Sequence, residues 1–266
     1  FGRGNNRSVP VGIIIDRINL LVKNGYKEVV LTGVDITDYG KDLPGSPDLF
    51  QMVKRILNLV PELKQLRLSS IDCAEISPNF WPLLENQRLM PHFHLSLQSG
   101  NNLILKRMKR RHTRKQVIDF CREVKKRRED VVFGADLIAG FPTETNEMFA
   151  DSIRLIDECN LTHLHIFPFS LKESTPAARM PQVSKDIIKS RAKKLRSHGE
   201  KKLLRYLNKQ IGTTATMLVE QSNLKGSFGK SQHFTKILIN EKLPEGSIVN
   251  CKIYKIKRNI LQAKII

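Results

Sequence analysis

The 266-residue sequence contains little of what several protein classes depend on. It has four cysteines: Cys73, Cys121, Cys159 and Cys251. They are widely spaced and form no CxxC or CxxxCxxC pattern, which argues against a disulfide framework and against a zinc site. A reducing compartment, the cytoplasm, suits such cysteines. No apolar run reaches ~18 residues, so we expect no transmembrane helix, and we find no signal peptide.

Acidic residues are also scarce. The chain has 26 Asp and Glu against 45 Lys and Arg, which gives a net charge of +19. This excess favours a polyanionic partner, because each phosphate that a cation neutralises releases condensed counterions. We favour nucleic acid over an ordinary solvated basic surface. A membrane is a weaker alternative, since no strongly amphipathic basic helix with aromatic anchors stands out.

Helical and strand patterns alternate along the first 209 residues. Helices are predicted at 11–24, 48–60, 78–84, 113–128, 143–159 and 184–209, with Ser77, Thr113 and Thr143 as expected N-caps. Strands are predicted at 28–32, 65–70, 92–98, 131–139 and 163–168. This alternation predicts βα units and a parallel sheet. The polar and apolar residues alternate within the strands, which favours a barrel over an open doubly wound sheet. No GxGxxG follows a strand, which argues against a Rossmann site.

The pattern changes after Gln210. Short strands separated by turns are predicted at 213–220, 226–230, 235–239, 248–254 and 259–265, which is typical of a small all-β barrel of OB-like size. Gly212 marks the boundary, so the sequence predicts two domains, 1–209 and 210–266. The lysine-rich strands of the second domain suit an RNA-facing surface, and the polar face of a half-exposed strand is an equal alternative. The lysines in question are Lys252, Lys255 and Lys257.

The stretch from Met90 to Arg114 joins a polar strand to a cationic run. In the strand, three apolar residues point one way and three polar residues point the other. The polar residues are His94, Ser96 and Gln98. If the apolar set packs on helices, the polar set lines a lumen. Seven of the ten residues 106–115 are Lys or Arg and none is acidic, so a small charged ligand and a polyanion could be handled together.

The strand at 131–139 places Gly134, Asp136 and Ile138 on one face. A buried carboxylate needs a partner, and Arg67 on another strand is a candidate. The strand ends in a sharp turn at Gly140, at the carboxyl edge where barrel enzymes hold ligands. Taken alone, the segment could equally be a strand, a turn and a helix cap.

Two shorter features are ambiguous by themselves. The turn from Gly33 to Asp35 could bind an amine or a carboxylate through its backbone, although a plain βα loop is the better interpretation. His163 and His165 share a strand face and could bind a metal. No third ligand is visible at a useful spacing, so polar lumen or core positions are favoured.

Five segments in register resemble the radical S-adenosylmethionine (SAM) methylthiotransferases, and most closely the branch that modifies threonylcarbamoyladenosine in tRNA. They are LTGVDITDYG (31–40), LRLSSID (66–72), MPHFHLSLQSGNNLILKRMKRRHTR (90–114), FGADLIAGFPTETNEMF (133–149) and HLHIFPFSLKESTPAARMPQV (163–183). The resemblance covers essentially the whole chain, and the C-terminal strands look like the family's TRAM RNA-binding domain. It implies an α/β fold: a partial (β/α)6 radical-SAM barrel missing its first strand, followed by the small all-β domain.

The resemblance also implies a chemistry. In the family, a 4Fe–4S cluster on three cysteines reduces SAM to a radical that abstracts a hydrogen from the adenine ring. A second cluster supports sulfur insertion, and another SAM supplies the methyl group. The implied partner is the tRNA anticodon stem-loop; the sulfur donor is unknown, and no membrane partner is expected.

Specific residues can be carried over by resemblance. Seven lie where SAM is bound: Gly33, Val34, Ser96, Gln98, Asp136, Ile138 and Gly140. Five in the basic run are expected at the RNA: Arg107, Lys109, Arg110, Arg111 and Arg114. Arg110 and Arg111 could reach either the SAM carboxylate or a tRNA phosphate, and phosphate contacts would position tRNA without reading its bases. No catalytic or metal-binding residue is expected in this chain.

The sequence departs from the family pattern at its start. Residues 1–10 resemble the stretch that follows the third cluster cysteine, so we expect the cluster cysteines, the first strand and an N-terminal cluster domain to be absent. Association with a separate N-terminal portion is one expectation. Two alternatives stay open: an inactive remnant that only binds tRNA, and a sister methylthiotransferase acting on a ribosomal protein. Unpaired barrel edges also predict poor solubility for the chain alone.

Overall fold

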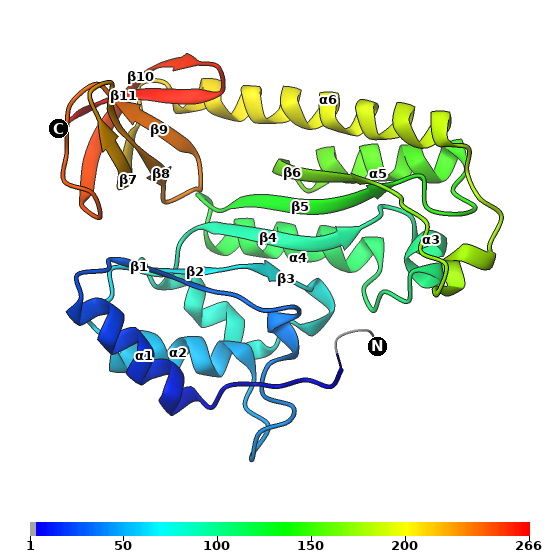
Figure 1. The fold of residues 1–266 in the computed structure, drawn as a ribbon, viewed down its shortest axis with the longest axis horizontal. Coiled ribbons are helices and arrows are strands. Elements are labelled where there is room, and N and C mark those ends of the chain that lie inside the picture. The colour runs from blue at the N-terminus through cyan, green and yellow to red at the C-terminus, as the bar shows by residue number, and fades with distance from the viewer. Residues whose placement is uncertain (1–3) are drawn as a thin grey trace. The chain divides into compact units, whose positions relative to one another are not determined.

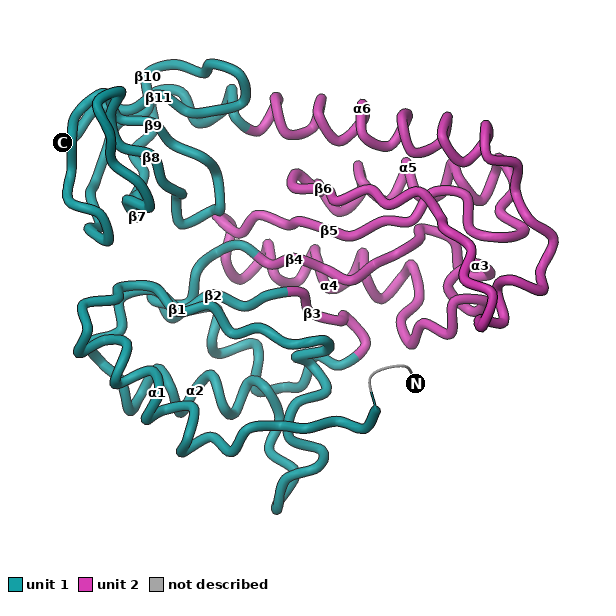
Figure 2. Tube along the Cα trace, viewed as in Figure 1, with its two compact units in different colours: residues 1–69, 75–92, 207–266 teal, residues 70–74, 93–206 magenta. Residues whose placement is uncertain are grey.

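The computed structural model describes residues 4–266, and the chain divides into two compact units (Figure 2). Unit 1 comprises the residues up to 69, residues 75–92 and residues 207–266. Unit 2 comprises residues 70–74 and 93–206. Within 4–266, no helix combines the length and the apolar character needed to cross a lipid bilayer.

The first part of unit 1 is a two-stranded parallel sheet with helices beside it (Figure 1). Its elements are α1 (Val11–Lys23), β1 (Glu28–Leu31), α2 (Leu49–Leu59) and β2 (Gln65–Leu68). A capping box fixes the start of α2. The Asp48 side chain accepts hydrogen bonds from backbone amides of the first turn, and the Gln51 side chain accepts one from the Asp48 amide. The apolar face of α2 enters the core, where Ile56 is 0% exposed.

Short 3₁₀ helices connect these elements: η1 (Ile36–Asp38), η2 (Cys73–Glu75), η3 (Pro78–Glu85) and η4 (Pro176–Arg179). The helical segment predicted at 78–84 is confirmed as the 3₁₀ helix η3. Pro82 lies inside η3, and proline has no N–H for the α-helical ladder. Ser77 is the N-cap residue, as predicted, with a proline in the first turn, although its side chain makes no capping hydrogen bond.

The C-terminal part of unit 1 is a closed five-stranded barrel (Figure 1). Its strands are β7 (Thr214–Asn223), β8 (Gly226–Ser231), β9 (Lys236–Ile239), β10 (Ile248–Lys257) and β11 (Ile260–Ile265). The order is β10-β11-β9-β8-β7, in which β9 and β11 are parallel. Gly229 is needed where β7 and β8 meet, since a Cβ there would lie 1.8 Å from the Leu218 carbonyl oxygen. The predicted small all-β barrel is confirmed.

Unit 2 is built on a four-stranded sheet with helices packed beside it (Figure 1). In sheet order, the strands are β3 (Ser70–Ile71), β4 (His92–Gln98), β5 (Val132–Ala139) and β6 (Leu161–Pro168). The helices are α3 (Asn102–Arg107), α4 (Arg114–Arg127), α5 (Asn146–Glu158) and α6 (Lys185–Gln210), whose last residues belong to unit 1. The pairs β3–β4 and β5–β6 are parallel, as the alternation of strands and helices predicted.

Two details of unit 2 depend on the ends of its helices. Thr113 caps α4 in a capping box with Gln116, as predicted. The predicted cap at Thr143 is wrong: α5 begins at Asn146, and the Thr145 hydroxyl accepts from the Met148 amide at 3.2 Å. Thr143 instead has a left-handed φ of +68°, which places it in the turn before the helix.

The strand predicted at 65–70 is interrupted at Ser69. The Ser69 amide donates to the Leu31 carbonyl oxygen at 3.0 Å, in the sheet of unit 1. The next residue, Ser70, pairs with His94 in the sheet of unit 2. The parallel strands therefore form one sheet of two and one sheet of four.

Candidate functional site

The polar residues of β4 and β5 share one face of the unit 2 sheet. The apolar residues between them are all 0% exposed: Phe93, Leu95, Leu97, Phe133, Ala135 and Leu137. Four of the residues on the opposite face are half-buried: Ser96, Gln98, Asp136 and Ile138. This alternation confirms the predicted apolar and polar faces of β4. Gln98 ends the strand with a left-handed φ of +67°.

Asp136 lies between histidines of the two neighbouring strands. Its Oδ1 is 2.8 Å from His94 Nε2 and 3.1 Å from His165 Nδ1. Burial would raise the pKa of Asp136, but the hydrogen bonds and charges of the two histidines outweigh burial and lower it. The carboxylate is therefore ionised at neutral pH. Arg67, which the sequence suggested as its partner, pairs instead with Glu28 at 2.8 Å inside unit 1.

The loop after β5 is held by a buried ion pair that the sequence reasoning missed. The Gly140 amide donates to Glu144 Oε1 at 3.0 Å, and Arg191 donates to the same oxygen at 2.8 Å. Burial raises the pKa of Glu144 against the opposing effect of Arg191. Gly140 has a φ of +74°, and a Cβ there would lie 2.5 Å from Ile188 Cγ1. Only the glycine turn was visible in the sequence, because Arg191 lies 47 residues beyond Glu144.

The other two residues carried over as SAM-binding, Gly33 and Val34, follow β1 in unit 1. Both are exposed, and both line an open cavity of about 920 Å³ within that unit. Its walls come from residues 4–9, from α1, from β1 with the turn after it, and from α2. This volume falls in the range of about 300–1,000 Å³ that small-molecule sites occupy. Five of the seven predicted residues thus lie on β4, β5 and the loop after β5, and two lie at this cavity.

Asp72 contacts the middle of the basic run at 106–115. Its Oδ2 accepts from Arg110 at 2.8 Å, and its Oδ1 lies 3.1 Å from His112 Nδ1. Burial would raise the pKa of Asp72, but bonds from His112 and the Ala74 amide, with the charge of Arg110, lower it to about 2. Arg111 is farther away, 3.9 Å from Oδ2, and its side chain is 47% exposed. Arg110 therefore holds this carboxylate.

Two more arginines of the run bond within unit 2. Arg107 bonds to the Thr143 hydroxyl, and Arg114 pairs with Glu158 at 2.6 Å. The outward cations of the run are Lys106, Lys109, Arg111 and Lys115. Of the five RNA contacts predicted here, two are exposed and three take part in the bonding of the protein itself.

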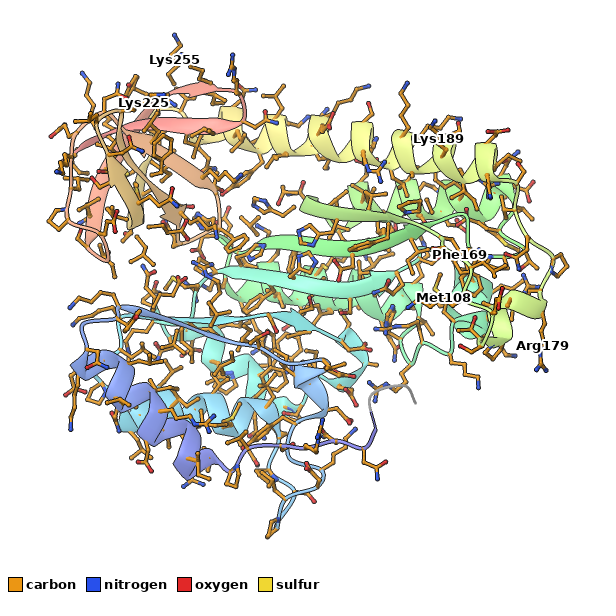
Figure 3. The ribbon with its side chains drawn as sticks, in the orientation of Figure 1. Met108, Phe169, Arg179, Lys189, Lys225 and Lys255 are labelled. Carbon is orange, nitrogen blue, oxygen red and sulfur yellow. The ribbon has the colours of Figure 1, made fainter. Side chains whose placement is uncertain are left out.

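The lysines predicted at RNA in the barrel are all exposed on β10: Lys252, Lys255 and Lys257. Lys255 projects outward from the barrel in Figure 3. Lys252 stands directly opposite Lys264 of β11. Like charges directly opposite each other destabilise a sheet, so an anion bound across this pair would stabilise it.

The four cysteines do not fit a metal or an iron–sulfur cluster. Cys121, Cys159 and Cys251 are at most 3% exposed and belong to the core. A hydrogen bond with Cys159, together with burial, raises the pKa of the Cys121 thiol well above its ordinary value. Burial does the same for Cys73 and raises the pKa of Cys251 to about 11. Clusters are held by several thiolates at once. Among residues 4–266, no cysteine belongs to a group of three or more His, Cys, Asp or Glu side chains whose ligand atoms lie within 4.8 Å of one another.

Known proteins resemble this chain along its whole length. Residues 1–156 match the family model described as the radical SAM superfamily. The threonylcarbamoyladenosine tRNA methylthiotransferase MtaB of Rickettsia prowazekii is 48% identical over 267 residues, which cover 100% of this chain and 62% of that protein. A tRNA-2-methylthio-N(6)-dimethylallyladenosine synthase of Staphylococcus haemolyticus is 31% identical over 268 residues, which cover 97% of this chain and 51% of that protein.

Among solved structures, a radical S-adenosylmethionine methyltransferase from Kitasatospora setae is 14% identical, with a TM-score of 0.49. The match covers 64% of this chain and 33% of that one. At this TM-score, neither fold nor function follows from the similarity.

Proposed function

The chain belongs to the radical SAM superfamily, and on this premise we propose that it is part of a methylthiotransferase that modifies threonylcarbamoyladenosine next to the anticodon of tRNA. The 48% identity to MtaB along the whole chain carries the proposal. Because the chain spans 62% of that relative, the activity, substrate and partners of the complete protein belong to the proposal too. A tRNA substrate and free thiols both suit the cytoplasm.

We assign SAM binding to the seven residues that the resemblance indicates. In unit 2, Ser96 and Gln98 offer a hydroxyl and an amide that can bind the ribose and the carboxylate. The turn at Gly140 presents backbone groups at the end of β5, close to Ile138 and Asp136. In unit 1, the exposed backbone of Gly33 and Val34 borders the cavity. When bound, SAM supplies the radical and methyl-transfer chemistry of the family.

We assign no step to an iron–sulfur cluster, because the four cysteines do not fit one. The residues of this chain are proposed to bind and orient SAM and tRNA. We assign residues 1–209 to a radical-SAM barrel and residues 210–266 to a TRAM-like RNA-binding domain. The closed five-stranded barrel and its exposed lysines support the second assignment.

The test of the modification is the tRNA of a strain deleted for this locus. Mass spectrometry of its nucleosides should show that the methylthio derivative is lost and that threonylcarbamoyladenosine without the methylthio group is retained. Plasmid-borne restoration of the locus should return the modification. An unchanged methylthio pool would refute the proposal.

SAM binding can be measured on the purified chain by calorimetry. Gln98→Ala should weaken SAM binding, because the amide is lost while the half-buried position tolerates a small side chain. Leu103→Ala, an exposed change on α3, is the matched control and should leave binding unchanged. Equal affinities in the two variants would remove Gln98 from the site.

A second candidate is a protein that binds tRNA without catalysis, and the misfit of the cysteines favours it. Anaerobic reconstitution with iron and sulfide separates the two candidates. An iron–sulfur absorbance with release of 5′-deoxyadenosine would rule out the non-catalytic candidate. Loss of tRNA binding in the lysine variants argued below, without any such release, would support it.

A further inference from the structure

Three potential metal ligands meet on the polar face of the unit 2 sheet. They are His94 on β4, Asp136 on β5 and His165 on β6, and their ligand atoms all lie within 4.8 Å of one another. Among residues 4–266, this is the one such group of His, Cys, Asp and Glu side chains. Of the two histidines that the sequence suggested as a metal pair, His163 and His165, only His165 belongs to this group, and the fold adds Asp136 and His94.

The spacing of these atoms matches the edges of a coordination polyhedron. Asp136 Oδ1 is 2.8 Å from His94 Nε2 and 3.1 Å from His165 Nδ1. Ligands bound to one ion at about 2.1 Å lie about 3.0 Å apart at right angles and about 3.4 Å apart in a tetrahedron. The two imidazole nitrogens lie within 4.8 Å of each other. An ion could therefore enter as the rings adjust around it, when each imidazole gives up the proton on the nitrogen that faces Asp136 and carries it on the other nitrogen.

The strands hold the three side chains in place. β4, β5 and β6 are consecutive in the sheet, and Asp136 and His165 are register partners. Sites built on strands are positioned more accurately than sites on loops. The two imidazole rings are 4.6 Å apart between centroids and tilted by 32°, and each presents a nitrogen to the carboxylate.

The arrangement also leaves a route for an ion and open coordination positions. The side chain of His94 is 10% exposed, that of Asp136 is 21% exposed and that of His165 is 62% exposed. The site is thus closed on one side and open on the other, as in metal sites that keep positions for water or a substrate.

We propose that His94, Asp136 and His165 bind a divalent first-row transition metal ion through two imidazole nitrogens and one carboxylate oxygen. This donor set suits Zn²⁺, Co²⁺ and Fe²⁺, whereas Mg²⁺ and Ca²⁺ prefer oxygen ligands alone. The alternative is a hydrogen-bonded triad that orients Asp136 without an ion. The inference does not depend on the proposed function, because it concerns the binding of a metal to this chain without SAM or tRNA.

The test is a titration of the chelator-stripped chain with Zn²⁺ against a chromophoric competitor. We expect one ion per chain. Asp136→Asn, His94→Gln and His165→Gln should each weaken binding by at least about tenfold, since even the loss of a residue that only orients a ligand costs about 10–100-fold. The His165 side chain is 62% exposed, so the His165→Gln variant should fold normally. This variant can therefore decide the test even if the other two misfold.

A histidine with one carboxylate partner provides the matched control. His198 Nε2 lies 3.1 Å from Asp157 Oδ2 on the surface, without a third ligand. His198→Gln should leave Zn²⁺ binding unchanged. If His198→Gln and His165→Gln behave alike, or if the stripped chain binds no Zn²⁺, the three residues form a hydrogen-bonded triad only and the proposal fails.

Co²⁺ gives an independent readout of the ligands. We expect d–d absorption of a nitrogen- and oxygen-ligated ion, abolished by His165→Gln, and an anomalous peak between the three side chains in crystals soaked with the metal. Thiolate-to-cobalt charge-transfer bands that persist in His165→Gln would place the ion on cysteines and overturn the assignment.

Discussion

At the residue scale, Asp72 couples the stability of the protein to pH. Its pKa of about 2 lies below the ordinary 3.8, so ionised Asp72 stabilises the folded state above about pH 4, and this stabilisation is lost as the pH falls towards about 2. We expect Asp72→Asn to lower the free energy of unfolding by about 2 kcal/mol near neutral pH. Urea denaturation followed by circular dichroism should also show a smaller loss of stability in acid for the variant.

The control for this prediction is an exposed carboxylate. Asp119 forms an i,i+4 pair with Lys115, and its side chain is 49% exposed. Surface pairs of this kind contribute about 0–1 kcal/mol, so Asp119→Asn should change stability little. Equal losses in the two variants would show that the environment of Asp72 has no special effect.

Gly140 is the second residue whose contribution can be isolated. Its φ of +74° and the position of Ile188 both oppose a side chain. Gly140→Ala should therefore destabilise by about 1–3 kcal/mol for overpacking, beyond the cost of the left-handed backbone. Gly25→Ala is the matched control, because Gly25 has a φ of +90° and a Cβ there would meet nothing within 4 Å. If thermal denaturation shows equal losses, the contact with Ile188 costs nothing.

The neighbours of Asp136 show what residue patterns can and cannot predict. Alternation along β4 and β5 correctly predicted which side chains share the polar face. It could not identify His94 and His165 as the partners of Asp136, because that requires the strand order and the Asp136–His165 register. Charge alone suggested Arg67 as the partner of Asp136, but Arg67 forms an ion pair with Glu28.

At the element scale, β1 is an edge strand through which the chain can associate. Among residues 4–266, it pairs with β2 alone. Val30 on β1 is 47% exposed, and Ile13 and Leu20 of α1 are 46% and 60% exposed. Exposed apolar edges pair with other chains, so we expect the chain to self-associate as its concentration rises. Val30→Lys should reduce the weight-average mass measured by light scattering.

A lysine substitution at another exposed apolar residue is the control. It distinguishes an effect at the edge of β1 from a general gain in solubility. Leu103 is 42% exposed on α3, away from any strand edge. Leu103→Lys adds the same charge and should leave self-association largely intact. A wild-type chain that stays monomeric, or an equal effect of both substitutions, would contradict the role of β1.

The elements also show where local patterns stop being informative. Periodicity located the strands, the barrel and most helices, because burial of one face imposes a period of about two or 3.6 residues. It missed the 3₁₀ type of η3, where Pro82 interrupts the α-helical ladder. It also missed the break at Ser69, because the segment reads as one short strand and its local pattern does not identify the neighbouring strand. The Ser69 amide bonds to Leu31, whereas Ser70 pairs with His94.

At the scale of the whole molecule, the net charge of +19 predicts a polyanionic partner without identifying the surface that binds it. The structure narrows the choice, because arginines of the 106–115 run are used inside unit 2. The lysines of β10 stay exposed, and Lys252 faces the like charge of Lys264. Phosphate bound there would relieve that repulsion and release counterions. The barrel is therefore the surface on which we expect tRNA to bind.

Two variants that remove equal charge can test whether the position of the lysines or the net charge of the chain determines tRNA binding. The triple variant Lys252→Ala, Lys255→Ala and Lys257→Ala should weaken tRNA binding about tenfold or more, and the salt dependence should become shallower by about one unit per lost phosphate contact. The matched triple variant Lys185→Ala, Lys189→Ala and Lys193→Ala removes the same charge from exposed positions of α6. Of these lysines, Lys189 is labelled in Figure 3. Filter binding across a salt series measures both. If the two triple variants lose affinity equally, net charge alone attracts tRNA and the barrel has no special role.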